Sequence, residues 1–172
     1  MKIWAIIGVV AIIGTGVAFY YFQPSEKGDF QDDYGRWVDV SEPPEKIVST
    51  VPSTTEILFA LGLGDRVVGV SNFCNYPPEV NSRVNESKIE RVSDYSSIKA
   101  EKIASLEPDI VFMGGIGGES AANDLEEGGL TVFALKEAST VSDVYKHIRM
   151  IGEITGVEDR AEDLIKNMEN RI

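Results

Sequence analysis

The stretch IVSTVPSTTEILFALGLGDRVVGV, residues 47–70, decides the fold. Each of its two ends is a short apolar run rich in β-branched residues, which favours a strand. Between them, Ser53 and Glu56 stand three apart as in a capping box, so we expect a helix that begins here and is closed by Gly62. A strand, a helix and a second strand in this order predict a βαβ unit on a parallel sheet.

The same alternation continues toward the carboxyl end of the chain. We predict strands at 47–50, 66–70, 109–113 and 131–135. We predict further helices over 99–106, about 119–127 and about 141–155, each stopped by a following Pro or Gly. The expected fold is therefore α/β, a single Rossmann-like lobe with a parallel sheet flanked by helices.

A last helical pattern begins at Val157, and its apolar face still runs at Ile172. We interpret 157–172 as the start of a longer helix, although a short terminal helix packed on the sheet would give the same pattern.

The amino-terminal segment 3–22, IWAIIGVVAIIGTGVAFYYF, carries no charge. Twenty helical residues at roughly 1.5 Å each span about the 30 Å of a bilayer core, so we expect a transmembrane anchor. A cleaved signal peptide, with Gly16 and Ala18 before the cut, is the alternative. Lys2 precedes the segment and acidic residues follow it, which places the rest of the chain outside the cytoplasm in either case.

Residues 23–45 are rich in polar and acidic residues and finish in Pro43-Pro44. Such a composition is typical of an unpacked tether, so we expect the folded part to start near Lys46.

Composition excludes several functions. The formal net charge of -12 would repel nucleic acid. Cys74 is the only cysteine, so an internal disulfide is impossible, and it lies too far from the apolar segment to accept a lipid anchor. His147 is the only histidine; we interpret it as a surface residue and expect neither a Ser-His-Asp triad nor a usual zinc site. The glycine-rich run 114–118 lacks the Lys of a phosphate-binding loop.

Three segments, IVSTVPSTTEILFALGLGDRVVGVSNFCNYPPE (47–79), RVSDY (91–95) and IKAEKIASLEPDIVFM (98–113), carry a resemblance to a known family. From about Lys46 to the end, the chain resembles the N-terminal lobe of the receptors that bind cobalamin or ferric siderophores for ABC importers. The resemblance implies a receptor of two α/β lobes joined by one long helix, with the ligand between them. The helix from Val157 would then begin this connector, and the second lobe would lie outside the chain.

The resemblance also implies which positions face the ligand. They are Pro52, Ser53, Thr54, Phe73, Tyr95, Gly114 and Gly115. Each follows a predicted strand, and loops at the carboxyl ends of parallel strands line the crevice where α/β sheets bind ligands. Phe73 and Tyr95 would offer flat apolar surface to a macrocycle or chelate, and the hydroxyl groups would orient it. Cys74 resembles a cysteine often found here and is expected to be a small buried group.

Glu101 resembles a glutamate that docks on an arginine of the permease, where a carboxylate near a helix N-terminus can pair with the guanidinium. The expected function is therefore an extracytoplasmic binding component without catalytic activity or cofactor, whose partners are the permease, the ligand and the membrane. No Arg or Lys stands among the predicted ligand positions, which favours a weakly charged corrinoid. The alternative is a small membrane-anchored α/β enzyme using Ser53 or the glycine-rich turn on a phosphorylated or acyl substrate.

Overall fold

A five-stranded parallel sheet forms the centre of the molecule in the computed structural model, which describes residues 12–13, 16–17, 29–94, 97–114 and 118–171. Its strands are β5 (Ile47–Ser49), β6 (Val67–Ser71), β7 (Glu90–Ser93), β8 (Ile110–Gly114) and β9 (Val132–Leu135). Their order across the sheet is β7-β6-β5-β8-β9, and each neighbouring pair is parallel. The four predicted strands are confirmed. β7 was missed because only one of its four residues, Val92, is strongly apolar.

Helices connect these strands in chain order. They are α1 (Pro52–Ala60), α2 (Pro78–Asn85), α3 (Ala100–Ser105), α4 (Gly118–Glu127), α5 (Val141–Thr155) and α6 (Glu158–Glu169), with a 3₁₀ turn at Gly64–Arg66. The predicted helices over 99–106, 119–127 and 141–155 are confirmed, whereas α2 was not predicted.

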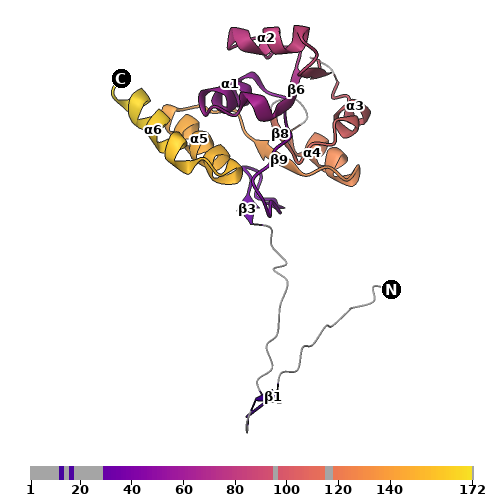
Figure 1. Ribbon diagram of the computed structural model, residues 1–172, viewed down its shortest axis with the longest axis vertical. Coiled ribbons are helices and arrows are strands. Elements are labelled where there is room, and N and C mark those ends of the chain that lie inside the picture. The colour runs from indigo at the N-terminus through magenta and orange to yellow at the C-terminus, as the bar shows by residue number, and fades with distance from the viewer. Residues whose placement is uncertain (1–11, 14–15, 18–28, 95–96, 115–117, 172) are drawn as a thin grey trace.

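Side chains of the sheet alternate between two cores. On β8, Phe112 lies in the core covered by α1, α2, α5 and α6, whereas Val111 and Met113 lie in the core covered by α3 and α4. Figure 1 shows α5 and α6 on the opposite side of the sheet from α3 and α4. Phe112 meets Phe133 of β9 edge to face, with ring centroids 6.0 Å apart. Because both faces are covered, the strands are continuous apolar runs, which is why the sequence revealed them.

The helix ends show which sequence signals predicted the helix boundaries correctly. α5 begins with a capping box between Thr140 and Asp143 and ends at Gly156, whose φ of +69° only a glycine adopts readily. α1 differs from the prediction because its N-cap is Val51 and no side chain caps it. Pro52 starts the helix instead, since its ring fixes φ and it has no N–H group to satisfy. The predicted capping box of Ser53 is therefore wrong.

α6 packs on α5. A Cβ on Gly152 would lie only 2.6 Å from the Cβ of Ala161, so the two helix backbones approach closely at a glycine. Ala161 and Ile165 of α6 are both buried. That α6 begins an inter-lobe connector stays a prediction.

Little of the apolar segment 3–22 falls within the described residues. β1 (Ile12–Ile13) and β2 (Gly16–Val17) pair antiparallel, and the rest of the segment lies outside the described residues. None of the helices in the described ranges is long and apolar enough to cross a bilayer.

The described part of the predicted tether, 29–45, belongs to the folded unit. β3 (Phe30–Gln31) and β4 (Trp37–Val38) form a hairpin, and Val38 and Asp32 are buried. The prediction of an unpacked tether is therefore wrong for 29–45, and 23–28 lie outside the described residues. The polar composition of this segment predicted disorder incorrectly, because hydrogen bonds within the fold satisfy its polar residues.

Candidate functional site

The carboxyl ends of the strands define the candidate site. The chain proceeds outward from β5 through β6 to β7 and then returns to β8 on the other side of β5. The loops after β5 and β8 therefore diverge at this edge, which is where ligands bind in open α/β sheets.

The loop after β6 presents aromatic surface at this edge. Phe73 is 49% exposed and Tyr76 is 60% exposed, whereas Cys74 between them is fully buried. Most large apolar side chains of the described chain are buried, so two exposed aromatic rings in one loop are unusual. The structure confirms Cys74 as a small buried group and adds Tyr76, which the string NYPPE contained but sequence reasoning passed over.

Arg91 of β7 holds this loop in place. Its Nη1 donates to the carbonyl oxygens of Ser71 and Cys74, the latter at 2.8 Å, and its Nη2 donates to Asn81 Oδ1 at 2.8 Å. Beneath it, the Cys74 sulfur accepts from Thr55 Oγ1 at 3.1 Å. The loop is thus fixed by groups on neighbouring elements, which leaves the aromatic rings outside.

The residues after β5 divide into exposed and buried positions. Pro52 is half-buried and Ser53 is exposed at the start of α1, but Thr54 is only 2% exposed. The buried Thr54 side chain does not reach the surface where a ligand would approach, so its predicted contact is not supported by this arrangement. Thr50 Oγ1, at the end of β5, is buried and has no hydrogen-bond partner among the described residues.

The turn after β8 contains the predicted glycines. Gly114 is half-buried, and a Cβ there would lie 2.8 Å from the Leu135 carbonyl oxygen, so only glycine fits. Gly115 and Tyr95 lie outside the described residues. Just after β7, Ser97 N donates to Asp94 Oδ1 at 3.1 Å.

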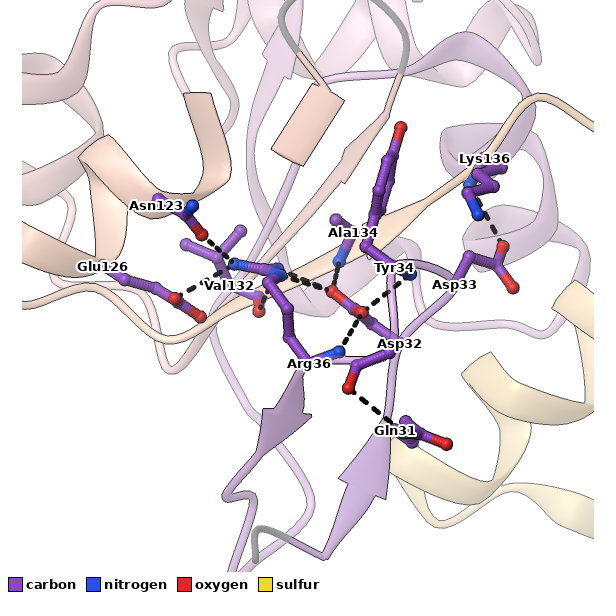
Figure 2. A network of polar contacts seen from close by, with 11 residues as sticks. Gln31, Asp32, Asp33, Tyr34, Arg36, Asn123, Glu126, Val132, Ala134 and Lys136 are labelled. Carbon is purple, nitrogen blue, oxygen red and sulfur yellow. Dashed lines mark hydrogen bonds and ion pairs between the residues drawn. The ribbon is translucent and has the colours of Figure 1, made fainter. Parts of the chain in front are cut away.

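The amino-terminal hairpin covers the outer edge of β9. Figure 2 shows Asp32 at the centre of a polar network. Its Oδ2 accepts from Arg36 Nη2 at 2.6 Å and from Ala134 N of β9 at 3.3 Å, and its Oδ1 accepts from Tyr34 N at 2.9 Å. Arg36 also pairs with Glu126 of α4 at 3.0 Å. The hairpin therefore occupies a strand edge that would otherwise be open to pairing.

Asp33 extends the network to α5. Its Oδ2 accepts from Lys136 N at 3.0 Å and contacts His147 Nε2 at 2.8 Å, and its Oδ1 accepts from Lys146 Nζ. Burial acts to raise the pKa of Asp33, but the hydrogen bonds from Lys146, Lys136 N and His147 outweigh it and hold that pKa below 3.8. His147 is 8% exposed, so its prediction as a surface residue is wrong.

Sequence reasoning missed this hairpin although a signal was present. Tyr34-Gly35 stands between Phe30 and Trp37-Val38, and a glycine between short runs with apolar or aromatic residues is typical of a hairpin. Gly35 has a φ of +82°, as such a turn requires.

Glu101 lies in the first turn of α3 and is exposed. Helices that follow parallel strands begin at the carboxyl edge of the sheet, so Glu101 stands on the same edge as the loops above. Its neighbour Lys102 pairs with Glu90 at 2.7 Å, whereas no ion pair joins Glu101 to another residue of the described chain. Its carboxylate is therefore available to a partner.

A separate hollow lies at the opposite, amino-terminal edge of the sheet. Its volume is about 710 Å³, and it is lined by residues 39–46, Glu107, Asp109 and Thr131. These residues precede β5, β8 and β9, so the hollow does not touch the loops that carry the predicted ligand positions. Its walls mix acidic side chains with the apolar surface of Val40, Pro43 and Pro44.

Two features of the described part of the chain bear on the alternative of an enzyme. Within it, no group of three or more His, Cys, Asp or Glu residues is arranged to hold a metal ion. Ser53 has no histidine base beside it, because the only histidine, His147, is bonded to Asp33.

The chain is similar in sequence to bacterial substrate-binding proteins. A family model described as periplasmic binding protein matches residues 47–172. An uncharacterized ABC transporter substrate-binding lipoprotein of Bacillus subtilis, YvrC, is 42% identical over 136 residues, covering 77% of this chain and 41% of the relative. A vitamin B12-binding protein of Vibrio parahaemolyticus is 32% identical over 114 residues, covering 66% of this chain and 39% of the relative.

Solved structures share the fold. A periplasmic heme binding protein from Pseudomonas aeruginosa superposes with a TM-score of 0.66 at 25% identity, over 74% of this chain and 44% of that protein. The matches to the two relatives thus span about two fifths of each relative's length.

Proposed function

Because the chain belongs to the periplasmic binding protein family, we propose that it carries the first lobe of an extracytoplasmic receptor that delivers a cobalamin-type or iron-chelate ligand to an ABC importer. The observation that carries the proposal is the pair of exposed aromatic side chains, Phe73 and Tyr76, at the carboxyl edge of the sheet. Exposed rings on an ordered loop are what a flat, largely apolar ligand requires.

Similar proteins indicate the ligand class. One relative is named a vitamin B12-binding protein and one solved relative a heme binding protein, and both ligands are large macrocycles. Among the ligand positions we retain Pro52, Ser53, Phe73, Tyr95, Gly114 and Gly115, and we add Tyr76. These positions carry no positive charge, which favours a corrinoid over a strongly anionic catecholate complex.

A second lobe would complete the site. The ligand surface of this lobe is an open edge of loops, and a single wall removes little of a macrocycle from water. In the proposed receptor α6 continues toward a second α/β lobe, and closure over the ligand creates the form that the permease recognises.

Calorimetric titration of the whole chain with cobalamin, a ferric hydroxamate, a ferric catecholate and haem tests the proposal. We expect saturable heat with one member of the panel, cobalamin first, and weaker heat after Phe73→Ala. Glu127→Ala, an exposed change on α4, serves as the control. No binding across the panel, by the chain alone and by a chain extended with a second lobe from a relative, would refute the proposal.

Permease docking is assigned to Glu101. An exposed carboxylate in the first turn of α3 can pair bidentately with an arginine, and such a rim contact governs register and association rate more than affinity. Charge reversal by Glu101→Arg should leave ligand affinity unchanged while binding to the permease falls. Glu127→Arg is the matched control, and equal permease binding by both variants would remove Glu101 from the interface.

Membrane attachment is assigned to the apolar segment 3–22. A lipid anchor on the single cysteine is unsuitable, because Cys74 is buried in the folded domain. The twenty uncharged residues supply the alternative, and the positive residue before them orients the domain outward. Retention in membranes after a carbonate wash would support an anchor, and release would support signal cleavage.

A further inference from the structure

Arg91 reaches the loop after β6, residues 72–77, from the neighbouring strand β7. Its Nη1 donates to the carbonyl oxygens of Ser71 and Cys74, which precede and follow Phe73 in the chain. The bond to the Cys74 carbonyl oxygen is 2.8 Å long. One guanidinium group therefore fixes the backbone on both sides of the exposed Phe73 ring.

Asn81 of α2 extends this support to the second aromatic residue. Its Oδ1 accepts from Arg91 Nη2 at 2.8 Å, and its Nδ2 donates to the Asn75 carbonyl oxygen at 3.3 Å. Asn75 directly precedes Tyr76 in the chain. Arg91 and Asn81, which we call the clamp, thus hold the backbone beside both exposed rings.

The charge of Arg91 is directed at this loop and at α2. All three of its acceptors among the described residues are uncharged oxygens. Arg83, by contrast, forms ion pairs with Asp65 and Glu79 on the surface. Hydrogen bonds from a charged donor are stronger than neutral ones, so the clamp restrains the loop more firmly than neutral side chains would.

The clamp keeps the aromatic rings in water. Phe73 is 49% exposed and Tyr76 is 60% exposed, although burying an aromatic ring is favourable. A mobile loop would be free to turn its rings onto nearby apolar surface. Hydrogen bonds that hold the backbone beside exposed rings are what a preorganised binding surface requires.

We propose that Arg91 and Asn81 are positioning residues of the ligand site, which preorganise the Phe73 and Tyr76 rings for a flat apolar ligand. The inference rests on the proposed function, because the two rings must contact the ligand. A ligand that meets ordered rings does not have to immobilise them on binding, and the entropy saved in this way raises its affinity.

Amide hydrogen exchange of the ligand-free chain tests the clamp. The Cys74 N–H donates to the Ser71 carbonyl oxygen, so its exchange rate reports on the order of the loop. Asn81→Ala should speed exchange in peptides covering 71–78. Asn85→Ala, an exposed change one turn further along α2, is the matched control and should leave these peptides unchanged. Equal exchange in the two variants would overturn the clamp.

Titration with cobalamin and with haem tests the link between the clamp and the ligand. For whichever of the two the wild type binds, Arg91→Met should weaken affinity about threefold to tenfold, as the release of an ordered side chain does. The loss should be smaller in the Phe73→Ala background, because one of the two rings to be positioned is gone. Arg91→Lys, which keeps a charged donor, should restore part of the affinity.

Equal losses in the two backgrounds would overturn the proposal, because Arg91 would then act on folding as a whole rather than through the ring. Failure of the wild type to bind either ligand would count against the proposed function. The exchange measurement needs no ligand, so it decides separately whether the clamp orders the loop.

Discussion

The two flanks of the candidate site are held in different ways. The loop after β6, which carries Phe73 and Tyr76, is fixed by Arg91 and by the buried Cys74. The outer edge of β9 is held by the hairpin 29–38, whose Asp32 reaches β9 across a separation of 102 positions. The contacts that hold the first flank are therefore local in sequence. Those that hold the second form only when the amino-terminal hairpin packs against β9.

This difference concerns stability as well as geometry. A loop whose supports lie within 20 positions can order with its own βαβ unit. A strand edge supported across 102 positions is completed only when the whole lobe has formed, because the long loop must first be closed. The two flanks should consequently respond to different substitutions, and each substitution below is chosen to affect one flank alone.

The largest expected effect follows Asp32→Ala. This change leaves Arg36, whose side chain is 13% exposed, without its fully buried carboxylate partner and removes the acceptor of Ala134 N. Breaking one side of a buried ion pair typically costs about 3 kcal/mol or more of unfolding free energy. Urea denaturation would measure the loss, with the exposed Asp39→Ala as control.

Amide hydrogen exchange would show whether Asp32→Ala destabilises only one flank. Peptides covering 131–136 should lose protection, whereas peptides covering 71–78 should keep it. Equal loss in both would contradict the division into two separately supported flanks.

Arg91→Met is the reciprocal change and should have a smaller effect. Methionine keeps much of the apolar stem but leaves the carbonyl oxygens of Ser71 and Cys74 without their donor. Hydrogen bonds from charged groups contribute about 1.5–3 kcal/mol, so urea denaturation should show a loss in that range. Arg83→Met, which breaks only surface ion pairs with Asp65 and Glu79, is the control and should cost roughly 0–1 kcal/mol. Protection lost at 131–136 but not at 71–78 would show that Arg91 does not hold the loop.

The local flank is also the one that the sequence could predict. The apolar runs gave the strands at 47–50 and 66–70 because both faces of a parallel sheet are buried. Those strands placed Phe73 at the correct edge. Tyr76 and β7 were not predicted, because neither stands in an apolar pattern.

The distant flank could not be predicted from composition. Asp32 and Asp33 stand in an acidic, proline-containing segment that resembles a tether, and nothing nearby in sequence identifies their partners on β9 and α5. His147 was wrongly predicted to lie on the surface for the same reason. It lies off the apolar face of α5, yet a carboxylate 114 positions away covers it. Burial of a polar residue by a distant polar partner leaves no periodic signal.

Acid should weaken the distant flank selectively, through Asp33. Hydrogen bonds from Lys146, Lys136 N and His147 outweigh burial and lower the folded-state pKa of Asp33, so its carboxylate stabilises the fold at every pH above its ordinary value of 3.8. That stabilisation disappears as the pH falls through the lower folded-state pKa, because the folded form must then bind the proton.

Asp33→Asn should therefore lower the melting temperature at pH 7, and the gap from the wild type should narrow below pH 3.8. Glu42→Gln, an exposed change in the same segment, should show no such convergence. A gap that stayed constant down to pH 2.5 would mean that the Asp33 charge does not hold the hairpin. The loss of stability in Asp33→Asn would then come from the altered hydrogen bonding of the amide rather than from the missing charge.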